Sequence, residues 1–218
     1  MRHVLGLLWL CIGLGAAPVV AGETYDLLFR QGALDGVAAV GGGLTYDQET
    51  SVPAAGAGPQ DTVLDLRFAP GDSVVATLRQ GERSRGVGTF PASVGNPVIM
   101  YFMETALRDM AQQTAGSPFY IRNRMKDSLL HEALIEAVSV PFGTQEVAAR
   151  RITLKPFAQD AARDRMGQFA DLALTVTVSD EVPGWYLSLV ATAPALPGSG
   201  APAYSSALTL MTAAEAAQ

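Results

Sequence analysis

The stretch DLALTVTVSDEVPGWYLSLVA, residues 171–191, decides the fold class. Leucine and valine alternate with polar or small residues over residues 171–179, and the same alternation returns over residues 185–191. A period of two is typical of a strand with one face on a core and the other in water, as in antiparallel sheets. The turn DEVPG, residues 180–184, joins the two runs, so the stretch predicts a β-hairpin.

Other parts of the chain are also predicted as strands. Alternation predicts strands at residues 24–30, 62–68, 73–79 and 150–156, and a short final strand is expected at 204–210. Proline, glycine and alanine dominate residues 51–60 and 193–203, which are predicted as loops.

The middle of the chain changes to a helical period. Asn96-Pro97 is a helix-start signal, and an amphipathic pattern runs from Pro97 to about Gln113. Ser117-Pro118 repeats the signal for a second helix that ends near Leu130. The sequence therefore predicts an α+β fold: a curved antiparallel sheet, forming an incomplete barrel, with two central helices packed on its concave face.

The N-terminus has the layout of a secretory signal peptide. In MRHVLGLLWLCIGLGAAPVVA, residues 1–21, a basic start leads into an apolar run and then into small residues. We expect cleavage after Ala21, which leaves residues 22–218 as a single domain. A retained N-terminal anchor is the alternative. A cleaved leader and the absence of cysteine beyond it indicate the periplasm of a Gram-negative bacterium, and the cleaved protein is expected not to be integral to the membrane.

Several chemistries are not supported by the residues beyond the leader. Cys11 is the only cysteine, so residues 22–218 have no thiolate and no disulfide, and His131 is their only histidine. His131-Glu132 lacks a second histidine at position 135, which is Ile, and no Gly-x-Ser-x-Gly motif is present. We therefore predict no enzyme activity, no metal and no cofactor, although a pair of carboxylates acting as a hydrolase stays open. The net charge of −6 argues against nucleic acid as a partner.

A basic stretch follows the second helix-start signal. In SPFYIRNRMKDSLL, residues 117–130, a helical wheel places Arg124 on the solvated face, Arg122 inside the apolar arc, and Lys126 beside Arg122. A buried guanidinium needs a carboxylate partner or a route to the surface. Arg122 is thus expected either to form a structural ion pair, or to hold the anionic head group of an amphiphile at the mouth of an apolar groove.

Methionines gather on the same two helices. Methionine is flexible and is over-used on apolar surfaces that accept varied ligands, but it also fills ordinary cores. Both uses stay open for these residues. If a groove is present, the candidate ligand-binding residues are Met103, Met110, Phe119, Arg122, Met125 and Lys126.

Two segments carry a resemblance to a known family. Residues 25–36, with Tyr25, Gly32 and Gly36, and residues 143–191, with the SDEVPGWYLSL hairpin, resemble an uncharacterised family of exported bacterial proteins thought to share the lipoprotein-carrier (LolA/LolB-like) fold. The resemblance implies an incomplete barrel whose concave side is apolar and covered by helices. It also implies binding of acyl chains or other lipidic groups. It carries over no functional residues.

These observations predict non-enzymatic binding of a hydrophobic or amphipathic molecule in the periplasm, with a lipid or acyl chain as the ligand. The alternative is a structural or scaffolding component of a cell-envelope complex, with envelope proteins as partners. A lined groove favours the first reading. A filled core with an exposed apolar patch favours the second.

Overall fold

The computed structural model describes residues 21–52, 60–195, 198, 200 and 202–217. The predicted signal peptide therefore lies outside the described residues, apart from Ala21. Residues 53–59, the centre of the loop predicted at 51–60, are outside them as well.

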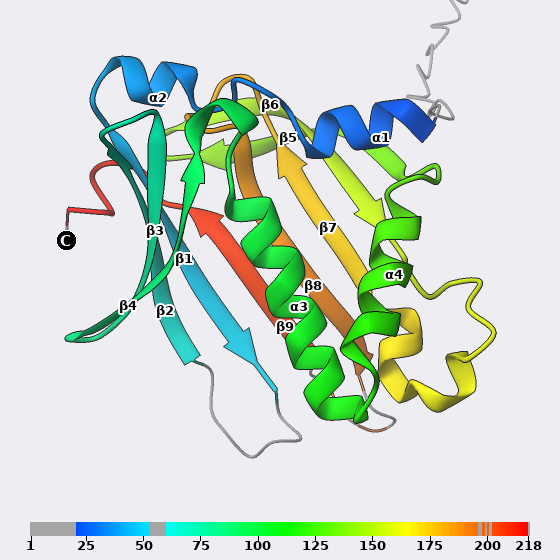
Figure 1. Ribbon diagram of the computed structural model, residues 1–218. Coiled ribbons are helices and arrows are strands. Elements are labelled where there is room, and N and C mark those ends of the chain that lie inside the picture. The colour runs from blue at the N-terminus through cyan, green and yellow to red at the C-terminus, as the bar shows by residue number, and fades with distance from the viewer. Residues whose placement is uncertain (1–20, 53–59, 196–197, 199, 201, 218) are drawn as a thin grey trace, which may run out of the picture.

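Within these residues, nine strands form one antiparallel sheet (Figure 1). They are β1 (Gly43–Ser51), β2 (Gln60–Ala69), β3 (Ser73–Gln80), β4 (Arg83–Pro91), β5 (Leu134–Phe142), β6 (Gln145–Leu154), β7 (Ala173–Val178), β8 (Tyr186–Ala195) and β9 (Pro202–Leu210). Their order is β4-β3-β2-β1-β9-β8-β7-β6-β5, so β4 and β5 are the edges and the sheet is not closed. The hairpin predicted over residues 171–191 is confirmed as β7 and β8.

The last strand of the chain lies in the middle of the sheet. On one side β9 pairs with β1, where Tyr46 lies opposite Leu210, and on the other it pairs with β8, where Leu189 lies opposite Leu208. Strands β1 to β4 pair in sequence order, as do β5 to β9. The C-terminal strand therefore joins two meanders into one sheet.

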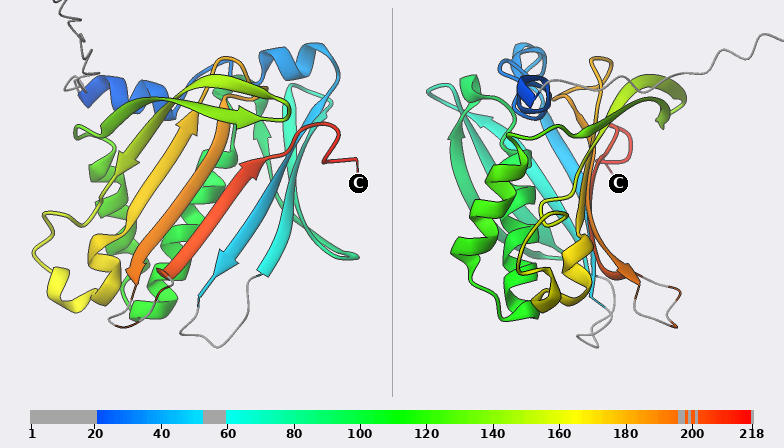
Figure 2. Two further views of the ribbon diagram at one scale, coloured as in Figure 1. Left: turned by 180° about the vertical axis from the view of Figure 1, so that it is seen from behind. Right: turned by 90° about the vertical axis from the view of Figure 1, so that its right-hand side faces the viewer.

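Two helices, α3 (Val98–Thr114) and α4 (Pro118–Ser128), pack on the concave face of the sheet (Figure 2). Both begin where the sequence predicts. The Asn96 side-chain oxygen accepts a hydrogen bond from the Val98 amide at 3.1 Å, and the Ser117 hydroxyl accepts one from the Tyr120 amide at 3.4 Å. These contacts satisfy amides that have no partner within the helix. The predicted α+β class, with an open antiparallel sheet and helices on it, is confirmed.

The remaining helical segments are short. They are α1 (Ala21–Leu28), α2 (Asp35–Ala39), η2 (Ala92–Val94), η3 (Arg163–Arg165) and η4 (Gly167–Asp171). The prediction of a strand at residues 24–30 is wrong, because α1 occupies most of this stretch. Thr24, Leu27 and Leu28 are the buried residues, and their spacing of three and four fits a helical face. The Phe29 amide also donates to the Tyr25 carbonyl, as a helix requires.

The space between α3 and the sheet is filled with side chains. From α3, Ile99, Phe102, Ala106 and Met110 are buried. From the sheet, the core includes large residues of β1, β8 and β9, among them Tyr46, Tyr186 and Tyr204. Each tyrosine hydroxyl donates a hydrogen bond, as buried polar groups require.

The start of α3, strand β1 and the β7–β8 turn meet at Asn96. The Asn96 side-chain amide donates to the Tyr46 hydroxyl at 3.1 Å and to the Gly184 carbonyl at 2.8 Å. Gly184 has φ of +76°, and a Cβ at this position would lie 2.2 Å from a methyl carbon of Leu44. Only glycine therefore fits the turn at this point.

The residues after this turn hold α1 in place. The Trp185 indole N–H donates to the Leu27 carbonyl at 2.8 Å, and the Tyr186 hydroxyl donates to the Leu28 carbonyl. The Arg30 guanidinium lies 4.2 Å over the Trp185 ring and forms an ion pair with Asp180. The C-terminal end of α1 is thus tied to the hairpin.

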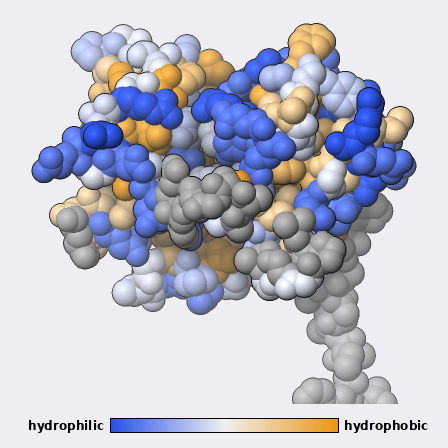
Figure 3. Space-filling view, turned by 90° about the horizontal axis from the view of Figure 1, so that it is seen from below, coloured by the Kyte–Doolittle hydropathy of each residue, from blue (hydrophilic) through white to orange (hydrophobic). Residues whose placement is uncertain are grey.

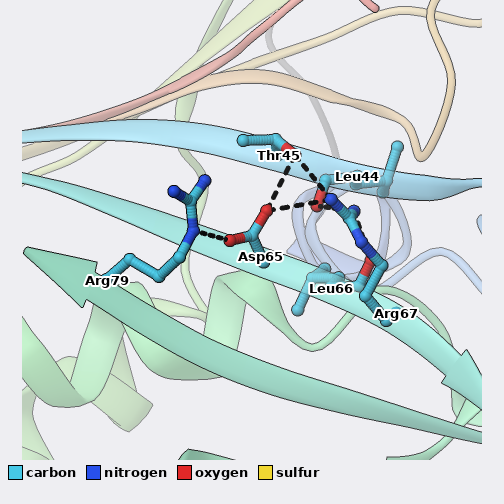
Figure 4. A network of polar contacts seen from close by, with 6 residues as sticks. All are labelled: Leu44, Thr45, Asp65, Leu66, Arg67 and Arg79. Atoms are coloured by element: carbon cyan, nitrogen blue, oxygen red, sulfur yellow. Dashed lines mark hydrogen bonds and ion pairs between the residues drawn. The ribbon is translucent and has the colours of Figure 1, made fainter. Parts of the chain in front are cut away.

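A charged network lies on the face of the sheet opposite the helices (Figure 4). Thr45 and Asp65 are cross-strand partners on β1 and β2, and their side chains alternate with the buried residues on either side of them. The Asp65 carboxylate accepts from Thr45 at 3.0 Å, from Arg67 at 3.1 Å and from Arg79 at 2.5 Å. Three donors, one each from β1, β2 and β3, therefore satisfy this nearly buried carboxylate.

Candidate functional site

An apolar groove lies between α3 and α4 and is also lined by residues of α1 and the position just after it. Its volume is about 390 Å³. Leu107, Met125 and Leu129 form its buried floor, and Tyr25, Phe29, Met100, Met103 and Leu130 form its walls. Glu104, Arg122 and Lys126 form its charged rim. These residues together are called the α3–α4 groove below.

The groove exists because α3 has two apolar faces. One face carries Phe102 and Ala106 into the core with the sheet. The other carries Met100 and Met103, which are not fully buried, toward α4 and α1. A helix with a single apolar stripe would bury that stripe on the sheet and leave a polar face outside. The additional apolar face of α3 lines the groove together with residues of α1 and α4.

One cation at the rim is paired with a carboxylate. Arg122 Nη2 lies 2.7 Å from Glu104 Oε1, and the two side chains are 41% and 48% exposed. A half-exposed pair of this kind contributes little to stability. The structure thus places Arg122 at the rim in an ion pair between α4 and α3, and its cationic charge is largely balanced there.

The second cation at the rim is not balanced. Lys126 is exposed and forms no ion pair or side-chain hydrogen bond within the part of the chain that the structure describes. Its ammonium group stands beside the apolar walls of the groove. An anion at this position would meet an uncompensated positive charge.

The six predicted ligand-binding residues divide into two groups. Met103, Arg122, Met125 and Lys126 lie together in the α3–α4 groove. Met110 and Phe119 do not line it. Met110 is almost fully buried and lines a different cavity together with Ile121 and Met166, and Phe119 is 70% exposed on α4.

Arg124 has a role that the helical wheel does not show. Its Nε lies 3.3 Å from Asp160 Oδ2, and the Asp160 side chain is only 1% exposed. The Tyr120 hydroxyl donates to the same carboxylate at 2.7 Å. Arg124 is exposed, as the wheel predicts, and it also helps to tie α4 to the segment before η3.

Sequence reasoning missed the contribution of α1 to the groove. Tyr25 and Phe29 stack with ring centroids 4.8 Å apart and form one wall. Their separation by four positions is a helical signal, but the same stretch also alternates like a strand.

A second hollow adjoins the groove beyond α1. Its volume is about 270 Å³, and it shares Tyr25, Phe29 and Met100 with the α3–α4 groove. From there its lining continues to Val94 and Phe90. The apolar surface therefore runs from α4 past α1 to the end of β4.

Another cavity lies at the opposite end of α3. Its volume is about 370 Å³, and it is lined by the α3–α4 turn and by residues of the η3 and η4 region, including Met166 and Arg165. Figure 3 shows this end of the molecule, where hydrophilic residues surround recessed hydrophobic ones.

Among the described residues, no group of three His, Cys, Asp or Glu side chains could hold a metal ion. None of the helices in the described part of the chain is long and apolar enough to cross a membrane.

An acidic group lies under α3, on the side away from the groove. The Tyr204 hydroxyl on β9 donates to Asp109 Oδ2 at 2.9 Å. Burial raises the pKa of the Asp109 carboxyl, although the Tyr204 hydrogen bond opposes this shift. Burial also raises the pKa of the Tyr204 hydroxyl, so this group stays protonated and remains the donor.

The pH dependence of the free energy of unfolding should reveal the raised pKa of the Asp109 carboxyl. Because the folded protein holds the Asp109 proton more tightly than the unfolded chain, the wild type should lose stability relative to Asp109→Asn as pH rises through the carboxyl's titration range. The difference should begin near the ordinary pKa of 3.8 and become constant above the raised value. Urea unfolding of both proteins from pH 3.5 to 7 measures it. Parallel stability curves would contradict the assignment, and Glu82→Gln, in an exposed turn, is the control.

Comparison with known proteins gives no independent assignment. No known protein family matches this chain, and no curated protein is significantly similar to it. The resemblance to the lipoprotein-carrier fold therefore stays a prediction from the residues quoted above.

Proposed function

We propose that the protein binds an amphipathic, lipid-like molecule in the α3–α4 groove without chemical conversion. The acyl part lies among the methionines and leucines of the floor and walls. The anionic head group lies at the rim beside Lys126. The observation that carries the proposal is an apolar groove with an unpaired cation at its edge.

Size and lining both support this assignment. A volume of about 390 Å³ lies within the range of roughly 300–1,000 Å³ that is common for small-molecule sites. Met100, Met103 and Met125 can adjust to chains of different shape because methionine is unbranched and flexible. The adjoining hollow beyond Tyr25 and Phe29 would let a longer chain extend along the same apolar surface.

The proposed location is the periplasm, on the basis of the predicted signal peptide. A second candidate function is that of a scaffolding component of an envelope complex. Two observations favour it: the space between α3 and the sheet is filled, and apolar residues around the groove, such as Met100 and Leu130, are exposed, as in patches that serve protein contacts. Binding of a small amphiphile in solution separates the two functions.

Replacing the unpaired cation should weaken binding of an anionic amphiphile. We expect Lys126→Ala to reduce the affinity for a fluorescent fatty acid by about three- to tenfold, the effect of losing one partly exposed charged contact. Added salt should weaken binding to the wild type as well. A fluorescence titration at low and high salt measures both effects.

The chain offers a matched control, because Lys155 is its only other lysine, is exposed just after β6 and does not line the groove. Lys155→Ala should bind like the wild type, and Met103→Ala should alter affinity through the apolar wall. Absence of binding by the wild type would refute the proposed function. Equal affinities of the Lys126 and Lys155 variants would show that the head group does not bind beside Lys126.

A further inference from the structure

Exposed apolar side chains are concentrated around the α3–α4 groove. Tyr25, Met100 and Leu130 line the groove and are each about half exposed or more, and Val94 lines the hollow next to it. Phe119 is 70% exposed on α4. Exposure of several large apolar residues on one side of a protein marks an interaction surface.

Phe119 belongs to the same side of α4 as the rim of the groove. It precedes Arg122 by three positions and Lys126 by seven, and residues at these spacings share a helix face. Leu130 follows at the other end of α4. Along this side of α4, two cationic residues, Arg122 and Lys126, thus lie between two apolar ones, Phe119 and Leu130. We call Tyr25, Met100, Phe119, Lys126 and Leu130 the docking face.

Charge decides which partner fits this face. The chain as a whole carries a net charge of −6, yet the unpaired charge on the docking face is the Lys126 ammonium. A second copy docked symmetrically through this face would bring two such cations together, because a two-fold interface places the same patch on both subunits. An anionic surface that also accepts apolar side chains fits better. The head-group layer of a bilayer has both properties.

We propose that the docking face binds the surface of an anionic lipid bilayer, with Phe119 and Leu130 inserted among the head groups and Lys126 beside lipid phosphates. The groove opens on this face, so a bound amphiphile could pass between groove and bilayer without crossing water. The inference goes beyond the proposed function and does not rest on it, since Phe119 lies outside the groove.

Vesicle flotation tests the inference. Expressed protein, its N-terminus established by mass spectrometry, is mixed with vesicles of phosphatidylcholine alone or with added phosphatidylglycerol. We expect the wild type to float with the anionic vesicles more than with the neutral ones, and less at high salt. Phe119→Ser should reduce the partition coefficient by about three- to tenfold.

Val40→Ser is the matched control. Val40 is 81% exposed and follows α2, which lies on the opposite side of the molecule from α4 (Figure 1). This variant should float like the wild type. Equal flotation with both kinds of vesicle, or equal loss in the Val40 and Phe119 variants, would overturn the inference. A concentration-dependent dimer that Phe119→Ser abolishes would overturn it in favour of a second copy.

The same variants separate this inference from the proposed function. Phe119→Ser should leave fatty-acid binding in solution unchanged, because Phe119 does not line the groove. If no fatty acid binds but flotation still depends on Phe119, the proposed function fails and the docking inference stands. If fatty acid binds but the protein does not float with any vesicle, the docking inference fails and the proposed function stands.

Discussion

Gly184→Ala is expected to destabilise the fold by about 2–5 kcal/mol. A left-handed backbone costs a residue with a Cβ roughly 1–2 kcal/mol, and overpacking a filled interior costs about 1–3 kcal/mol. Both terms apply here, because φ is +76° and the new Cβ would lie 2.2 Å from Leu44 Cδ1. It would also lie 3.1 Å from the Asn96 side-chain nitrogen. Urea unfolding monitored by circular dichroism gives the free energy of unfolding.

Gly81→Ala separates the two terms. Gly81 also has positive φ, +55°, but a Cβ there would meet no other atom within 4 Å. Its substitution should therefore cost only the backbone term, about 1–2 kcal/mol. Equal losses for the two variants would show that the contact with Leu44 is not responsible.

Asn96→Ala is expected to cost about 2–4 kcal/mol. The side chain is buried and makes three hydrogen bonds, to the Val98 amide, the Tyr46 hydroxyl and the Gly184 carbonyl. Loss of a helix cap costs about 0.5–2 kcal/mol, and leaving a buried polar group without its partner costs about 1–3 kcal/mol. Denaturant unfolding measures the sum.

Two further variants locate the source of this loss. Asn96→Ser can still accept from the first turn of α3, so it should recover part of the stability while the Gly184 carbonyl stays without its donor. Asn123→Ala, on the exposed side of α4, should change stability little. If Asn96→Ala cost no more than Asn123→Ala, the junction would not hold the fold together as described.

The parts of the fold that could be predicted carry strong local signals. Asn96-Pro97 and Ser117-Pro118 mark the starts of α3 and α4 because an N-cap side chain followed by proline suits a first helical turn. The hairpin of β7 and β8 follows from alternation on both sides of a turn.

The missed strands lack those signals for physical reasons. The edge strand β5 (Leu134–Phe142) has no fully buried residue, so its sequence need not alternate strictly. Strand β4 contains Gly86 and Gly88, which weaken any strand pattern. Strand β1 was missed although Tyr46 is fully buried, because a polar residue, Gln48, is the next to face inward. The burial of Gln48 is explained by hydrogen bonds that its side-chain oxygen accepts from Tyr101 and Thr62, and no local sequence pattern reveals these contacts.

The candidate site was predictable only for residues whose relative positions follow from a single helix. A wheel of α4 places Arg122, Met125 and Lys126 together, and the structure does the same. Which neighbour covers which part of a helix depends on packing. Whether Met110 and Phe119 line the groove could therefore not be predicted from their own helices.

The central position of β9 has a consequence for how the chain folds. Until Leu210 can reach Tyr46 and Leu208 can reach Leu189, β1 and β8 each keep an unpaired edge. Contacts between segments so distant in sequence form slowly, since a long loop must close before they contribute. The chain therefore cannot complete its sheet until β9 has been synthesised and has left the ribosome.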